Sequence, residues 1–212
     1  MYVPAHFSFT DRTEVVAFMR RFNFAVIVSQ VDGQPFATHL PFVVEEREDG
    51  SVWLLAHFAR ANPQWKDLEE QTALVIFSEP HAYVSPSLYE KELNVPTWNY
   101  VAVHAYGRPV LIPEEAEARE LLEKQIQTFE KEYFTQWSNL PEEYKNGMLK
   151  GIAAFRMQVV RLEGKEKLSQ NKKMPEREKI AAHLSENTDS VVRETGAMMK
   201  KHLTGKSLPD HG

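Results

Sequence analysis

Cysteine is absent from the 212 residues, and this absence excludes several kinds of chemistry. Without thiols the chain has no disulfide framework, no cysteine nucleophile and no cysteine-ligated zinc or iron–sulfur site. No apolar run approaches the roughly 18 residues that span a bilayer, and the first residues lack a basic stretch followed by an apolar core. We therefore expect a cytoplasmic protein with no membrane segment.

A surplus of positive charge is also lacking, since 30 Asp and Glu against 25 Lys and Arg give a net charge of −5. A domain that holds DNA through its phosphates carries a basic face, because counterion release supplies much of that affinity. Only Gly164–Lys179 is locally basic, with six Lys and Arg against three Glu. DNA is therefore a weakly supported partner.

Aromatic side chains are abundant, with 12 Phe, 7 Tyr and 4 Trp. They suit a β-rich core or a pocket for a planar ligand. The length permits one core, and we expect a domain over 1–163, with 164–212 as a basic segment and helices packed on the same domain.

Turn signals and β-type runs predict an antiparallel sheet. Asp32-Gly33 and Asp49-Gly50 separate three runs and predict a three-strand meander over Phe24–Gln30, Phe36–Glu45 and Val52–Phe58. Further strands are expected over Thr72–Ser78, Ala82–Ser85, Trp98–Ile112 and Ile152–Leu162. Six or seven such strands interrupted by helices predict the α+β class, with a closed or partly closed barrel and peripheral helices.

Helices are predicted where capping residues precede apolar periodicity. The first is capped by Thr10 or Asp11, and Asn62-Pro63 opens a short helix through Glu70. In Glu114–Trp137 an apolar stripe recurs at Leu122, Ile126, Phe129, Tyr133 and Trp137. The remaining helices are expected over Glu142–Leu149, Pro175–Leu184 and Ser190–Leu203, followed by a frayed tail over Thr204–Gly212.

Five segments gather polar and aromatic residues within this β-rich sequence: Ala37–Phe42, Ala56–Trp65, Pro80–Pro86, Val95–Tyr100 and Lys167–Lys172. Together with Met1–Pro4 and Val101–Gly107, they resemble the PaiB family, described as FMN-binding negative transcriptional regulators. The resemblance implies an antiparallel split β-barrel of the FMN-binding type. It also implies a homodimer with FMN at the subunit interface.

Candidate cofactor-binding residues follow from what FMN presents, a dianionic phosphate and a planar ring with polar edges. A guanidinium suits the phosphate, and Arg60 stands where related oxidases have Ser-Arg-Lys, here Ala59-Arg60-Ala61. Lys167, Ser169 and Lys172 would complete the charge. The polar candidates around the phosphate and ring edges are Thr38, His39, Asn62 and Ser85, and Trp98 or Trp65 would cover the ring.

The histidines His39, His57, His81 and His104 raise the question of a metal, because neutral imidazole binds zinc or iron. None of them forms the helical pair of H-E-x-x-H. We interpret them as barrel histidines with satisfied hydrogen bonds and name no metal ligand. Haem bound through histidine, which the resemblance to split-barrel proteins implies for some relatives, stays a minor alternative.

The sequence is compatible with three functions. The first is an FMN-binding regulator that couples flavin or redox state to gene expression. The second is a flavin-dependent oxidoreductase acting on a small substrate, so enzymatic activity is undecided. The third is a cofactor-free split barrel whose cleft is filled by side chains such as Trp98 or Tyr100.

Overall fold

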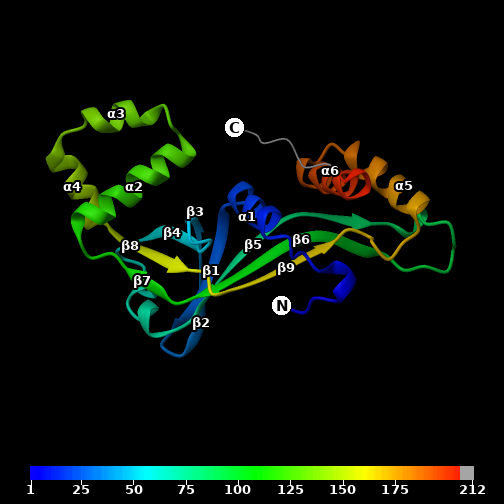
Figure 1. Cartoon of the computed structure of the whole chain (residues 1–212), viewed down its shortest axis with the longest axis horizontal. Helices are drawn as coiled ribbons and strands as arrows, with labels where there is room; N and C mark the ends of the chain where they lie inside the picture. Colours follow the sequence, from blue (N-terminus) through cyan, green and yellow to red (C-terminus); the bar gives the residue numbers. More distant parts are fainter. Residues whose placement is uncertain (206–212) are drawn as a thin grey trace. The chain divides into compact units, whose positions relative to one another are not determined.

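The computed structural model describes residues 1–205 and confirms the α+β class (Figure 1). Within residues 1–205, nine strands, more than the six or seven predicted, form two sheets of order β2-β1-β5-β6-β9 and β3-β4-β8-β7. Their bounds are Phe24–Val31 (β1), Gln34–Pro41 (β2), Val43–Glu46 (β3), Val52–Ala59 (β4), Ala73–Val84 (β5), Thr97–Gly107 (β6), Pro109–Leu111 (β7), Ile152–Gln158 (β8) and Arg161–Lys167 (β9).

Six α-helices accompany the sheets within residues 1–205. They are Arg12–Arg21 (α1), Glu115–Phe129 (α2), Tyr133–Asn139 (α3), Glu142–Lys150 (α4), Met174–Ser185 (α5) and Ser190–Thr204 (α6). Short 3-10 turns cover Ala5–Phe7 (η1), Pro63–Trp65 (η2), Leu68–Glu70 (η3) and Pro86–Leu88 (η4). No helix in this part of the chain is long and apolar enough to cross a membrane.

The chain divides into two compact units. Unit 1 contains Met1–Thr10, Ser78–Val103 and the chain from Glu163 onward, so it includes α5, α6 and most of β9. Unit 2 contains Asp11–Phe77 and His104–Leu162, with α1 to α4 and strands β1 to β4, β7 and β8. Strands β5 and β6 each begin in one unit and end in the other.

The hairpin of β1 and β2 forms as its turn predicts. Val31 pairs with Gln34, and the intervening Asp32 and Gly33 have φ of 51° and 74°. A two-residue turn with both φ values positive matches the right-handed twist of the flanking strands.

The predicted meander is wrong, because Phe36–Glu45 contains two strands rather than one. β2 ends at Pro41 and pairs with β1, whereas β3 starts at Val43 and pairs with β4 in the other sheet. Pro41 cannot donate a ladder hydrogen bond. The next residue, Phe42, is fully buried and donates its N–H to Asn23 O at 2.9 Å.

The predicted helix over Glu114–Trp137 is also broken. α2 ends at Phe129, because Glu130 adopts φ −154° and ψ 76°, and α3 begins at Tyr133. The buried face of α2 is Ala118, Leu121 and Gln125 rather than the predicted stripe, and Phe129 is 45% exposed.

Other boundaries shift for similar local reasons. The run Trp98–Ile112 is interrupted at Arg108 into β6 and β7, and the two runs from Thr72 to Ser85 form the single strand β5. The last two helices agree with the prediction, except that α6 includes Thr204, the first residue of the expected tail. Residues 206–212 of that tail lie outside the described part.

The core of unit 2 has two sides. Between the strands, Phe58 and Phe155 stack at 5.0 Å, and Phe42 contacts Phe77 and Phe155 at 6.0 and 6.2 Å. A second apolar cluster joins the strands to α2 and α4, formed by Val43, Leu55, Ile112, Ala118, Leu121, Leu149 and Ala154. Helix α2 therefore covers one sheet surface.

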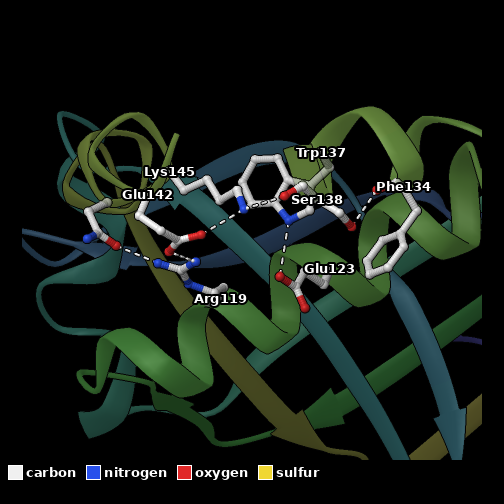
Figure 2. A network of polar contacts seen from close by, with 8 residues as sticks. Arg119, Glu123, Phe134, Trp137, Ser138, Glu142 and Lys145 are labelled. Atoms are coloured by element: carbon white, nitrogen blue, oxygen red, sulfur yellow. Dashed lines mark hydrogen bonds and ion pairs between the residues drawn. The ribbon is translucent and has the colours of Figure 1, made fainter. Parts of the chain in front are cut away.

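Polar contacts hold α3 and α4 to α2 (Figure 2). Arg119 donates to Glu142 at 2.6 Å, and Trp137 Nε1 donates to Glu123 at 3.1 Å. The buried Lys145 ammonium donates to Glu142 at 2.8 Å and to Ser138 O at 3.2 Å. Both cations lower the pKa of Glu142 by hydrogen bonding to its carboxylate, the contribution of Lys145 being the larger.

Candidate functional site

Thr38 and Asn62, two of the predicted site residues, meet in one hydrogen-bonded network in unit 2. Asn62 Nδ2 donates to Thr38 Oγ1 at 2.9 Å, and that hydroxyl donates to Gln64 Oε1 at 2.6 Å. Gln64 is fully buried, and its Nε2 donates to Ser29 Oγ at 2.9 Å and to the carbonyls of Ile27 and Phe36. The network fixes the loop after β4 against β1 and β2.

Arg60 lies at the end of β4, where strand pairing continues through its N–H to Gly151 O at 2.7 Å. Its guanidinium is 5.1 Å from the ring centroid of Trp65, whose Nε1 donates to Arg60 O at 2.9 Å. The residue is exposed, and no carboxylate within residues 1–205 forms an ion pair with it. An oriented, unpaired guanidinium is suited to bind an external anion.

The short helix expected after Asn62 is wrong, because only two separate 3-10 turns form there. Asn62 caps η2 by accepting from Gln64 N at 2.9 Å, Pro63 has no N–H, and Lys66 N donates to Pro63 O. Most backbone N–H groups at the start of this segment are therefore absent or already hydrogen-bonded. Arg60, rather than a helix terminus, is the group of this loop that is suited to bind an anion.

His39 is exposed on β2, and its ring stacks on Phe24 at 6.1 Å with an interplanar angle of 28°. Phe24 is 66% exposed, so a flat aromatic surface is open beside β1 and β2. Such a surface can contact one face of a planar ligand.

His57 on β4 belongs to a second polar contact that the sequence pattern did not indicate. Its Nδ1 lies 2.8 Å from Gln125 Oε1, and Gln125 Nε2 donates to Pro41 O at 3.3 Å. Burial lowers the pKa of His57, while the hydrogen bond to Gln125 opposes that shift. One feature could have pointed to this contact, because Gln125 is the one polar residue on the buried face of α2.

The predicted residues on β9 and after it lie in unit 1, where each has a partner. Lys167 Nζ donates to Thr97 Oγ1 and to Trp98 O, the latter at 2.7 Å, and burial, with a smaller contribution from Lys165, lowers its pKa. Lys172 Nζ donates to Asn94 Oδ1 at 2.9 Å. Lys167 has no ion pair with a carboxylate within residues 1–205.

Ser169 and Ser85 have local roles. Ser169 is buried with φ 61°, and its Oγ exchanges hydrogen bonds of 3.0 and 3.1 Å with the side chain of Asn99. Ser85 caps η4 by accepting from Ser87 N at 3.2 Å.

Trp98 is 53% exposed and forms an aromatic cluster in unit 1 with His81 and Tyr83. The ring centroids lie 5.7 Å from His81 and 6.0 Å from Tyr83, with edge-to-face geometry. Trp98 therefore does not fill a cleft of its own chain; the cofactor-free hypothesis named Trp98 or Tyr100 for that role. Trp65, the other predicted ring cover, is half-buried beneath Arg60.

One hollow of unit 2 is lined by other residues. An open hollow of about 530 Å³ in unit 2 is lined by residues such as Ser29, Gln71 and Arg161, and contains none of the predicted site residues. Within residues 1–205, no three His, Cys, Asp or Glu side chains come together as a metal site.

Comparison with known proteins identifies the family to which this chain belongs. Residues 1–161 match the family model described as "Putative FMN-binding domain". "Protease synthase and sporulation protein PAI 2" of Bacillus subtilis is 34% identical over 206 residues, covering 96% of this chain and 98% of the relative. The chain belongs to the PaiB family of FMN-binding-domain proteins.

Other relatives extend the comparison. An uncharacterized protein of Emericella nidulans is 30% identical over 210 residues, covering 78% of this chain and 84% of that protein. The solved flavocytochrome Anf3 from Azotobacter vinelandii has a TM-score of 0.61 at 23% identity, covering 78% of this chain and 72% of its own. A FAD and heme binding protein from Mycobacterium smegmatis also gives 0.61, at 18% identity and coverages of 82% and 79%. These likenesses establish the split-barrel type of fold.

Proposed function

We propose that the protein binds FMN and acts as a negative transcriptional regulator of the PaiB kind, coupling flavin or redox state to gene expression. The observation that carries the proposal is Arg60, an exposed guanidinium without a carboxylate partner in residues 1–205, in a chain of the FMN-binding-domain family. When bound, FMN would supply the redox chemistry, and the protein would bind and orient it.

The residues of unit 2 fit the chemistry of FMN. Arg60 offers a planar cation to the phosphate, and the network of Thr38, Asn62 and Gln64 fixes the loop that carries it. The open surface of Phe24 and His39 offers an apolar face for the ring.

The remaining candidate residues would contact the same FMN if the protein forms a homodimer. We assign Ser85, Trp98, Lys167, Ser169 and Lys172 to a cofactor site completed by a second copy of the chain. Trp98 supports this assignment because its ring is half exposed, and Lys167 because it has no carboxylate partner in the described residues. Relatives in fold include a flavocytochrome and a FAD-binding protein.

Direct contact with DNA has less support than flavin binding. In the basic segment Lys165 is buried and Lys167 and Lys172 are partly buried, so the segment is not a continuous exposed basic face. The proposed regulation therefore depends on flavin binding and does not require that this chain contacts DNA directly.

The first experiment is a titration of purified protein with FMN, followed by flavin fluorescence. Arg60→Ala should weaken FMN binding roughly ten- to hundredfold, since a hydrogen bond to a charged group contributes about 1.5–3 kcal/mol. Riboflavin, which lacks the phosphate, should bind both proteins equally. Arg47→Ala is the matched control, because Arg47 also lies over a tryptophan, at 4.0 Å from the ring centroid of Trp53.

Two results would count against the proposal. Absence of saturable FMN binding by the wild-type protein would remove FMN as its ligand. If FMN binds but transcript profiles are the same in cells carrying wild-type protein, Arg60→Ala or a deletion, the regulatory part fails.

A further inference from the structure

The contacts of Gln125 fix which nitrogen of His57 carries the proton. Pro41 O can only accept a hydrogen bond, so the atom of Gln125 that lies 3.3 Å from it must be the NH₂ group. The other amide atom, 2.8 Å from His57 Nδ1, is then the carbonyl oxygen, which can only accept. His57 is therefore protonated at Nδ1.

The second nitrogen of the neutral ring is left as an acceptor. With the proton on Nδ1, Nε2 carries a lone pair. No residue within 1–205 bonds to Nε2, and it is not among the buried polar atoms without a partner, so it remains in contact with solvent. Burial lowers the pKa of His57, which keeps the ring neutral near pH 7.

His57 marks the place where helical cover of the sheet ends. Val43 pairs with Leu55 under α2, and beyond this pair Gln125 contacts both His57 and Pro41, the last residue of β2. Pro41 pairs with Phe24 of β1, and His39, two residues before it, lies on the same surface of β2. The apolar cluster under α2 thus gives way, at Gln125 and His57, to the open strip that contains His39 and Phe24.

We propose that His57 is a binding residue whose Nε2 accepts a hydrogen bond from an N–H group on the edge of a planar heterocycle lying over the His39–Phe24 strip. The inference rests on the proposed function, and there the heterocycle is the flavin ring, whose edge carries an N–H between two carbonyl groups.

Gln125 is a positioning residue in this arrangement. It touches no ligand, and it acts by holding His57 in the tautomer that leaves Nε2 free to accept. Helix α2 thereby contributes to the binding site through Gln125, which contacts His57 and not the ligand.

The test compares riboflavin with riboflavin methylated at the ring N3, using the full-length protein. Neither ligand has a phosphate, so the comparison is independent of Arg60. Wild-type protein should bind riboflavin roughly tenfold more tightly than the methylated ligand, the value of one hydrogen bond. His57→Phe, which keeps a planar ring but has no acceptor, should bind both equally, and the control His183→Phe at an exposed position should behave as wild type.

Nitrogen-15 NMR of the imidazole gives a second measurement that needs no ligand. Wild-type His57 should show a protonated Nδ1 and an unprotonated Nε2. Gln125→Leu should shift the tautomer towards Nε2–H and reduce the preference for riboflavin over its methylated form. A His57 signal already dominated by Nε2–H in the wild type would overturn the inference.

The outcomes separate this inference from the proposed function. If wild-type protein binds FMN and riboflavin but does not discriminate against the methyl group, the role of His57 is wrong and the flavin site stands. If neither flavin binds, the proposed function falls, and the ligand assigned to His57 falls with it.

Discussion

At the scale of single residues, His57 links burial to the response of the fold to acid. Burial lowers the pKa of His57 below its ordinary value of 6.5 in the folded protein. As the pH falls through 6.5, His57 binds a proton in the unfolded chain before it does so in the folded chain. Stability therefore rises with pH in this range and is lost on acidification.

Replacing His57 should remove this part of the pH dependence. Urea unfolding at about pH 7.5 and about pH 5.5 should show a smaller loss of stability for His57→Gln than for the wild type, because glutamine does not titrate. His183→Gln serves as the exposed control. An identical loss in all three proteins would show that His57 does not carry the effect.

At the scale of elements, Gly107 marks a close approach of strand backbones in unit 2. A Cβ added there would overlap Gln158 O and lie 2.7 Å from Met157 Cγ, whereas one added to Gly147 in α4 would meet nothing within 4 Å. β6 ends at Gly107 and β8 at Gln158. Only a residue without a side chain allows this approach.

The two glycines should therefore respond in opposite directions to the same substitution. Gly107→Ala should destabilise the protein by about 1–3 kcal/mol, the range for overpacking. Gly147→Ala should stabilise it by about 0.5–1 kcal/mol, because alanine favours the helix interior. Chemical denaturation measures both, and a neutral Gly107→Ala would mean that the strands separate without cost.

The parts of the fold that the sequence predicted correctly are those governed by local chemistry. The Asp32-Gly33 hairpin, the Asp11 cap and the last two helices depend on neighbouring residues, and they form as expected. The split of Phe36–Glu45 between two sheets depends on which strand each half pairs with. Such pairing is a long-range property that periodicity does not contain.

The candidate site shows the same division. From the sequence, residue type and turn context could select three candidate binding residues, Arg60, Thr38 and Asn62. The contacts of Gln64 with Ser29, and of Gln125 with His57, join positions 35 and 68 residues apart. No local pattern brings these side chains together, so the sequence did not predict them.

At the scale of the whole molecule, the predicted site residues are divided between the two units. Arg60, Thr38, His39 and Asn62 belong to unit 2, and Ser85, Trp98, Lys167, Ser169 and Lys172 belong to unit 1. In the proposed homodimer each site would take one set from each copy. Cofactor binding and dimer formation should then depend on each other.

The exposed aromatic cluster of unit 1 offers the test of that dependence. Trp98 and Tyr83 are 53% and 50% exposed and contact each other; exposed apolar patches of this kind mark interaction surfaces. Trp98→Lys should raise the dimer dissociation constant roughly 30-fold, as loss of an aromatic hot spot of about 2 kcal/mol would. Sedimentation analysis measures this constant, with Tyr144→Lys at a comparably exposed tyrosine of α4 as the control.

Adding FMN to the same experiment distinguishes a dimer with the cofactor site in its interface from a dimer with that site elsewhere. A ligand that binds only the completed site stabilises the assembly by mass action, so FMN should lower the dissociation constant of the wild-type dimer. In Arg60→Ala this effect of FMN should be reduced, while the dimer itself remains. A dimer that responds to Trp98→Lys but not to FMN would place the aromatic cluster in the interface and the cofactor elsewhere. A monomer that still binds FMN would show that a single copy completes the site.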